Sequence, residues 1–247
     1  MERREVPRSV RRGLLLDIAA SSDEGDNRLS LDVSALACLA RVKPARVVVH
    51  GPSGAGRPRV EAFLEGVYAQ AFDGHIRRHY PQLMSLEDDS GAILAAAGFR
   101  FAEHQPLYLE HYLDRSAERE IAEATAGSVA RRQVVEIGNL ASTGDGAAVI
   151  LFLALARHLG DLGLAFAIVT ATRPLRRILR RAGFEAIELA KADPGRLPDG
   201  GADWGRYYGS DPVVMAGSIP GAFDRFMRLR TGADRRCAGA GLRGAFA

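Results

Sequence analysis

The sequence predicts a mixed α/β fold, in which one mostly antiparallel sheet carries helices on both faces. A strand, a long apolar helix and a second buried strand follow one another between Gln133 and Thr170, the order of a βαβ unit with two parallel strands. Two further strands, at 83–86 and 92–101, are joined by the acidic, glycine-ended turn 88–91, which is typical of an antiparallel hairpin. Parallel and antiparallel pairs within one chain predict a mixed sheet.

Apolar patterns predict the remaining elements. The β-branched run at 46–50 indicates a strand, and the helical spacing of apolar residues at 60–72 indicates a helix. The later elements are expected to be a short helix or bent segment at 106–113, a helix at 117–126, strands at 134–137 and 165–170 around a helix at 147–159, a helix at 175–181 and a last strand at 186–189.

One domain with two extensions is expected from the 247 residues. Residues 1–44 mix Arg, Ser, Asp and Gly without a sustained period and predict a partly disordered extension, with a short helix at 34–41. Residues 45–230 are expected to form the domain, and the Gly-, Ala- and Arg-rich residues 231–247 a disordered tail.

Composition excludes several classes of protein. Lys and Arg number 33 against 30 Asp and Glu, and this balance is too even to indicate nucleic-acid binding. No apolar stretch approaches the roughly 18 residues of a membrane span, and the short run from Leu14 ends at Asp17, too early for an export signal. Cys38 and Cys237 form neither a disulfide framework nor a metal-ligand spacing. We therefore expect a cytoplasmic protein without a bound metal.

Residues 51–58 nearly match a phosphate-binding loop. The glycines at 51 and 56 have the correct spacing after a strand. Arg57, however, stands where the motif has its phosphate-binding Lys, and Pro58 replaces the hydroxyl that would hold magnesium. The segment is therefore predicted to be a turn.

Several motifs resemble known families. The end of the last helix, Arg181 to Phe184, resembles the GNAT acyltransferase superfamily, and Glu136 on a strand before a loop and a long helix is similar to the acyl-homoserine lactone synthases. The segments at 106–114, 135–141, 170–176 and 192–217 together resemble the thermostable hemolysin family, with a match over about residues 46–225.

The GNAT resemblance implies a thioester donor. In that fold two parallel strands splay apart and admit a pantetheine arm, which implies acyl-CoA or the phosphopantetheine of an acyl carrier protein as co-substrate, with no covalently bound cofactor. The pyrophosphate loop corresponds to 141–146, so the implied donor-binding residues are Ser142, Thr143, Gly144 and Gly146. Ala141 and Asp145 depart from the basic character of that loop and favour a carrier protein over free CoA. Alternatively, the loop is only a capped turn.

The candidate catalytic residues are Glu136, Asn139 and Glu110. Leu179 occupies the position of the tyrosine that protonates the leaving thiolate in many GNAT enzymes, so that role is vacant. Glu136 lies among apolar strand residues, where desolvation would raise its pKa and make it a general base for the acceptor amine. It could equally point outward or pair with an arginine. Asn139 and Glu110 rest on the resemblance alone.

Candidate substrate-binding residues lie after the second parallel strand and in a late loop. Arg173 follows that strand's carboxyl end and could clamp a carboxylate or phosphate. Trp204, Arg206, Tyr207 and Tyr208 combine aromatic rings with a charge in a glycine-rich loop, although Trp204 could instead cover the sheet. The arginines of the helix at 175–181 indicate a solvated face or a dock for an acidic carrier protein.

The sequence leaves three classes of function open. The first is an acyltransferase that moves an acyl group from a thioester to the amine of a small molecule. The second is a membrane-active hemolysin, although no long amphipathic element or alternating pore-forming pair is evident. The third is a GNAT-like binding module without activity, which Leu179 and Asp145 favour.

Overall fold

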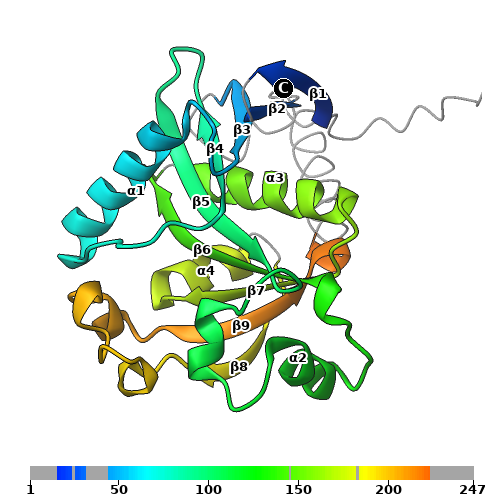
Figure 1. The fold of residues 1–247 in the computed structure, drawn as a ribbon, viewed down its shortest axis with the longest axis vertical. Coiled ribbons are helices and arrows are strands. Elements are labelled where there is room, and N and C mark those ends of the chain that lie inside the picture. The colour runs from blue at the N-terminus through cyan, green and yellow to red at the C-terminus, as the bar shows by residue number, and fades with distance from the viewer. Residues whose placement is uncertain (1–15, 24–25, 32–43, 145, 182–183, 223–247) are drawn as a thin grey trace, which may run out of the picture.

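The computed structural model describes residues 16–23, 26–31, 44–144, 146–181 and 184–222. Within these residues all strands belong to one sheet of nine, in the order β1-β2-β3-β4-β5-β6-β7-β9-β8 (Figure 1). Every neighbouring pair is antiparallel except β6 and β7, which are parallel. The predicted mixed, mostly antiparallel sheet with one parallel strand pair is therefore confirmed.

The antiparallel part of the sheet contains the first six strands in chain order. These are β1 (Leu16–Asp23), β2 (Asp26–Leu31), β3 (Arg46–His50), β4 (Gln82–Glu87), β5 (Ile93–Phe101) and β6 (Val134–Ser142). The sequence predicted the last four. β1 and β2 lie within the segment expected to be a partly disordered extension, whereas the helix expected at 34–41 and the tail at 231–247 lie outside the described residues.

The remaining part of the sheet follows the parallel crossover. Helix α3 (Ala147–Asp161) connects β6 to β7 (Phe166–Ala171), and α4 (Arg173–Arg181) follows β7. Strand β8 (Ile187–Lys191) is the predicted last strand, but β9 (Val213–Ser218), which the sequence analysis missed, lies between it and β7. This inserted strand gives β7 an antiparallel partner on the side away from β6.

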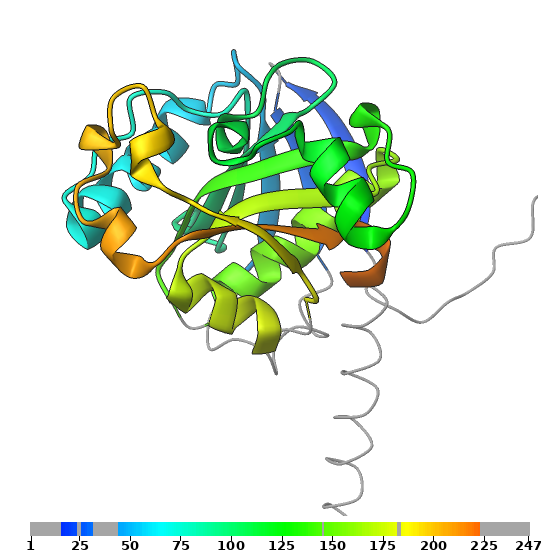
Figure 2. The same ribbon diagram turned by 90° about the horizontal axis from the view of Figure 1, so that it is seen from below.

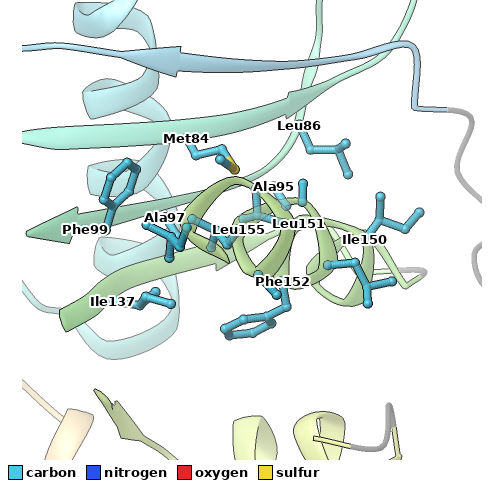
Figure 3. Close-up of a cluster of buried hydrophobic side chains, with 14 of the residues drawn as sticks. Met84, Leu86, Ala95, Ala97, Phe99, Ile137, Ile150, Leu151, Phe152 and Leu155 are labelled. Carbon is cyan, nitrogen blue, oxygen red and sulfur yellow. The ribbon is translucent and has the colours of Figure 1, made fainter. Parts of the chain in front are cut away.

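Helices cover both faces of the sheet (Figures 1 and 2). Helix α3 packs against β4, β5 and β6 through a nearly continuous apolar surface, and Phe99, Ile137 and Leu151 meet in the largest core cluster (Figure 3). The other face carries α1 (Arg57–Phe72), α2 (Ala117–Thr125) and the 3-10 segment η2 (Tyr108–Tyr112). Because neighbouring strand residues point to opposite faces, Glu136 lies on this second face.

None of the described helices combines enough length with enough apolar character to cross a bilayer.

Candidate active site

The parallel strands β6 and β7 separate halfway along their length. Their pairing runs from Val134–Phe166 to Ile137–Val169 and then ends. Beyond that point β6 remains paired with β5 as far as Ser142, and β7 remains paired with β9. A bulge in β6 accompanies the separation, and Asn139 there has a positive φ of 49°. The strand predicted from the sequence ended at residue 137, whereas the bulge lets β6 continue to Ser142.

A cavity of about 200 Å³ occupies the opening between the two strands, and we call it the inter-strand cavity. Ile137, Gly138 and Leu140 line it from β6, and Val169 and Thr170 line it from β7. Its other walls are mainly aromatic and apolar, from Tyr68, Phe72, Tyr80, Tyr108, Tyr112, Trp204, Tyr207 and the start of α4. The cavity is therefore a largely apolar slot that enters the sheet between two strands.

Tyr80 lies flat across two paired glycines of the sheet. Gly98 of β5 and Gly138 of β6 are direct cross-strand partners. A Cβ at Gly98 would lie 2.6 Å from the Tyr80 side chain, and one at Gly138 would lie 2.2 Å from its hydroxyl oxygen. Only glycine at both positions leaves room for the ring, whose hydroxyl donates to Glu136 Oε1 at 2.8 Å.

Glu136 is buried, with 1% of its surface exposed, which contradicts an outward orientation. Its carboxylate accepts hydrogen bonds from Tyr80, from the backbone N–H of Tyr108 at 2.8 Å and from that of Leu109 at 3.2 Å. Arg100, its cross-strand neighbour, lies 3.4 Å from Oε2. Burial raises the pKa of Glu136 above its ordinary value, although Arg100 and the three hydrogen bonds oppose the shift. This direction agrees with the expectation from the sequence.

The turn that resembles a phosphate loop holds Tyr80 in place. Arg57, in the position of the motif's lysine, donates to the carbonyl oxygens of Tyr80 at 2.7 Å and of Pro81 at 2.9 Å. Its Nε also donates to Glu61 at 2.7 Å. The guanidinium is thus used inside the protein, and the turn supports Tyr80 from its backbone side.

A second cavity, of about 480 Å³, lies on the Glu136 side of the sheet, and we call it the charged cavity. Its charged walls include Arg77, Arg78, Arg100, Asp199 and Asp203. It shares Tyr80, Tyr108, Asn139 and Trp204 with the inter-strand cavity, so these four side chains form the junction of the two cavities.

Asn139 presents an unpaired donor at this junction. The residue is 6% exposed, and its Nδ2 is one of three buried side-chain nitrogen or oxygen atoms among the described residues that lack a hydrogen-bond partner. Arg100 Nε is another, and it also lies beside the junction. Buried polar groups are normally paired, so these two unpaired N–H donors are exceptional and are candidates for binding a ligand's oxygen atoms.

The predicted aromatic loop packs over the junction. Trp204 Nε1 donates to the Tyr108 hydroxyl at 2.9 Å, and Tyr207 donates to the carbonyl oxygen of Thr170 at 3.2 Å. Gly205 permits this packing, since its φ is 51° and a Cβ there would lie 2.2 Å from the carbonyl oxygen of Phe72. Trp204 and Tyr207 line the inter-strand cavity.

The remaining loop residues lie outside both cavities. Tyr208 is behind the cavity wall, where its hydroxyl contacts that of Tyr112 at 2.7 Å. Arg206 is exposed and pairs with Asp73 at 2.9 Å.

Two further predicted residues also lie away from the cavities. Arg173 is exposed and pairs with Asp211 at 3.4 Å. Glu110 accepts from the backbone N–H groups of Leu107 and Ala117 at 2.9 Å and pairs with Arg131 at 2.6 Å. Burial acts to raise the pKa of Glu110, but these hydrogen bonds and Arg131 hold it below its ordinary value. The contacts indicate a carboxylate that fixes η2.

The structure describes residues 141–144 and 146 of the predicted donor loop, and Asp145 lies outside the described residues. Ser142 lines the inter-strand cavity and accepts a hydrogen bond from the Gly144 N–H at 3.1 Å. Thr143 is exposed, and its hydroxyl donates to the Leu94 carbonyl oxygen at 3.1 Å. Gly144 and Gly146 have φ of 102° and 87°, so both positions need glycine. Gly146 precedes α3 without a side-chain cap. The N–H groups of Ala147 and Val149 donate to the carbonyl oxygens of Gly144 and Gly146, and Ala148 lines the inter-strand cavity.

Sequence reasoning missed Tyr80 and Arg100. Arg100 is a charged residue in an otherwise apolar hairpin strand, and that was the available signal for it. Tyr80 had no such signal in the sequence, because its role depends on two glycines that become neighbours only when β5 and β6 pair.

The chain belongs to the thermostable hemolysin family, which matches residues 50–223, more than half of the sequence. This confirms the family resemblance. Among curated proteins, none matches this chain in sequence.

Several solved structures have a similar fold. They include TofI in a ternary complex with an inhibitor and MTA (16% identity, 72% of this chain and 96% of that chain covered, TM-score 0.49). The CoA-dependent acyl-homoserine lactone synthase MesI is similar over 71% of this chain and 89% of its own, with 15% identity and a TM-score of 0.43. N-acetylglutamate synthase from Neisseria gonorrhoeae, complexed with coenzyme A and N-acetyl-glutamate, is similar over 72% of this chain and 36% of its own, with 18% identity and a TM-score of 0.40.

Proposed function

We propose that this protein is an N-acyltransferase that moves an acyl group from a thioester donor to the amine of a small molecule. The observation that carries the proposal is the separation of β6 and β7 directly beside the buried carboxylate of Glu136. The separation leaves backbone groups of both strands without strand partners on one side, and a slender amide-containing arm can pair with them. Such a donor, acyl-CoA or acyl carrier protein, places the reaction in the cytoplasm.

The two cavities suit the two substrates. The inter-strand cavity is apolar and narrow, as an acyl-pantetheine arm requires, whereas the charged cavity on the Glu136 side suits a polar acceptor. The substrates then meet at Tyr80, Tyr108, Asn139 and Trp204, where the cavities join. Holding an amine against a thioester at that junction would itself supply a large part of the rate enhancement.

Glu136 is the proposed general base, and Tyr80 passes the proton to it. Both carboxylate oxygens already accept hydrogen bonds. Of the three donors, only Tyr80 donates through its side chain, and Tyr80 is among the residues that line both cavities. As the amine nitrogen bonds to the thioester carbon, its proton passes to the Tyr80 oxygen while Tyr80 gives its own proton to Glu136. The carbon–sulfur bond then breaks, and the proton held by Glu136 returns through Tyr80 to the sulfur, which leaves as a thiol and restores the carboxylate. The raised pKa of Glu136 favours this step.

Asn139 is the proposed donor to the thioester carbonyl. Its Nδ2 is buried, unpaired and located where β6 turns away from β7. A fixed N–H donor in a water-poor site stabilises the negative charge that develops on the carbonyl oxygen.

The identity of the donor depends on the loop before α3 and on α4. Gly144 and Gly146 let backbone N–H groups approach a phosphate at the start of α3, although the basic residue of a pyrophosphate loop is absent. Arg177 and Arg180 are exposed on α4, next to the mouth of the inter-strand cavity, where an acidic carrier protein could dock.

The test is thiol release from purified protein with acyl-CoA and acyl carrier protein donors and a panel of amines, followed by mass analysis of the product. Thiol release that depends on the amine, with a matching N-acyl product, is the expected result. The Arg177→Gln/Arg180→Gln variant should raise the KM for acyl carrier protein, more at low salt, and leave that for acyl-CoA unchanged. No release from either donor with any amine would contradict the proposal.

A GNAT-like binding module without turnover is the second candidate. It is favoured by Leu179, which is buried in the main core. Many GNAT enzymes have at this position the tyrosine that protonates the leaving thiolate. Binding of an acyl thioester without any release of thiol would distinguish it.

A further inference from the structure

We infer that the charged cavity accepts an amino acid, or a closely related carboxylate-bearing amine, whose carboxylate is held by Arg100. This inference rests on the proposed function and names the class of acceptor.

Arg100 has an incomplete set of partners. Its Nε is buried, lies 3.4 Å from Glu136 Oε2 and makes no hydrogen bond. Among the described residues, no group accepts a hydrogen bond from any of its nitrogen atoms. A guanidinium carries five N–H donors in a planar fork, and leaving a buried donor unpaired is unfavourable.

The position of Arg100 is fixed without a ligand. The guanidinium lies over the Tyr80 ring, with 4.2 Å from its central carbon to the ring centroid. Tyr80 itself is held by the paired glycines and by Arg57. The fork is therefore held in a defined place at the wall of the charged cavity, ready for a planar, two-oxygen group.

The charges around the cavity favour a ligand that carries both signs. Arg77 is neutralised by Asp203 at 2.5 Å, and Arg100 is partly neutralised by Glu136. Arg78 and Asp199 remain, one of each sign, and both line the cavity. A zwitterion matches this balance, whereas a dianion or a simple cation would not.

The stacking also explains how the amine reaches the reaction centre. A carboxylate bound by Arg100 lies beside the Tyr80 ring, and in an α-amino acid only one carbon separates the carboxylate from the amine. The amine then lies next to the Tyr80 hydroxyl, which is hydrogen-bonded to Glu136. The same residue that binds the acceptor thus aligns its nucleophile.

The experiment compares acids with matched amides. Binding of the common L-amino acids, β-alanine and γ-aminobutyrate, and of the carboxamide of each, is measured by calorimetry with the full chain. Acyl transfer to the same compounds gives KM and kcat. At least one acid should bind, and its carboxamide should bind about tenfold to a hundredfold more weakly, since a charge-assisted bond is lost.

Two variants distinguish recognition of the carboxylate by the Arg100 guanidinium from a loss of folding and from a change of charge beside Glu136. Arg100→Lys keeps a positive charge beside Glu136 but removes the fork, and it should raise the KM for the acid about tenfold to a hundredfold while leaving the carboxamide unaffected. Arg157→Gln, which removes an exposed ion pair with Asp161 on α3, is the control. It should change neither the KM for the acid nor the KM for the carboxamide.

The outcomes distinguish this inference from the proposed function. If acids and carboxamides bind equally, if Arg100→Lys keeps the preference for acids, or if no acid binds, the inference is overturned, while transfer to other amines would still support the acyltransferase. If acids bind through Arg100 and no thioester reacts, the acyltransferase fails and the carboxylate site stands.

Discussion

The regions around Glu136 and Glu110 contain two carboxylates that look alike in sequence but differ in burial, in access to a cavity and in the direction of their pKa shifts. Both lie in apolar surroundings, and both accept backbone hydrogen bonds at η2. Glu136 lines a cavity, is nearly fully buried and has a raised pKa because of that burial. Glu110 lines neither cavity, and Arg131 with its hydrogen bonds lowers its pKa.

The difference shows what makes a carboxylate available for chemistry. Arg131 approaches Glu110 closely with two nitrogen atoms, at 2.6 and 3.0 Å, so this carboxylate is firmly held in its ionised form. The Arg100 contact to Glu136 is longer, at 3.4 Å, and a tyrosine hydroxyl takes the place of a second cation. Glu110 fixes η2, and η2 in turn directs the N–H groups of Tyr108 and Leu109 at Glu136.

The largest expected effect separates the two carboxylates by activity. Glu136→Gln should lower kcat for acyl transfer by about 10²- to 10⁴-fold, because the general base is lost. Glu110→Gln should leave kcat nearly unchanged under conditions where it is folded. Thiol release measures both, with circular dichroism as the check on folding. Equal losses in the two variants would remove the distinction.

Asn139→Ala tests the proposed donor to the thioester carbonyl, which lies on the Glu136 side of the comparison. It should lower kcat about a hundredfold with little change in the binding of a donor analogue, because the donor acts on charge that forms in the transition state. The free energy of unfolding should fall by about 1 kcal/mol, because Ala tolerates the positive φ of this position less well than Asn, whereas the loss of Nδ2 removes no hydrogen bond. A large loss of donor affinity with unchanged kcat would show that Asn139 binds the ground state instead.

The contact between Tyr80 and the two glycines can be disrupted by a substitution that leaves both Glu136 and Glu110 in place. Gly138→Ala should lower the free energy of unfolding by about 1–3 kcal/mol and reduce kcat, because the new methyl group displaces the Tyr80 hydroxyl from Glu136. Gly66→Ala in α1 is the matched control, since open space surrounds Gly66, and it should stabilise the helix by up to about 1 kcal/mol. Denaturant unfolding and thiol release check both variants.

The smallest effect concerns pH. The lowered pKa of Glu110 contributes stability that is present above its ordinary value of 4.5 and lost as the pH falls through the folded pKa. Glu110→Gln should therefore be less stable at neutral pH and lose less stability on acidification. The raised pKa of Glu136 acts oppositely, because its contribution is lost as the pH rises through the folded pKa.

Unfolding measured between pH 3 and 7 tests these signs. In Glu136→Gln, stability should rise more steeply from pH 4.5 upward than in the wild type. Parallel pH curves for the two variants and the wild type would contradict the opposite environments of the carboxylates.

Much of the fold could be predicted from the sequence, because its signals are local. The β-branched run of β3, the hairpin turn before β5 and the apolar length of α3 each specify their own element. Strand β9 was missed because its short run follows a long irregular segment and pairs with strands far back in the chain. The bulge at Asn139 was missed because it depends on the register between β5 and β6.

The site was predictable only where one residue carries the signal. Glu136 could be found as a carboxylate in an apolar strand, and Trp204 and Tyr207 as loop aromatics beside glycines. Arg173 and Arg206 appeared equally good as charges near the expected ligand, yet both pair with surface aspartates. Tyr80 and Arg100 belong to the site through pairings across β5 and β6 that no local pattern reveals.

The most direct measurement is a crystal structure of the protein with a non-hydrolysable acyl-CoA analogue. The account predicts that the pantetheine arm lies between β6 and β7 beyond Ile137 and Val169, with the acyl oxygen within hydrogen-bonding distance of Asn139 Nδ2. An arm bound elsewhere, or strands that close together with Glu136 cut off from the ligand, would contradict it.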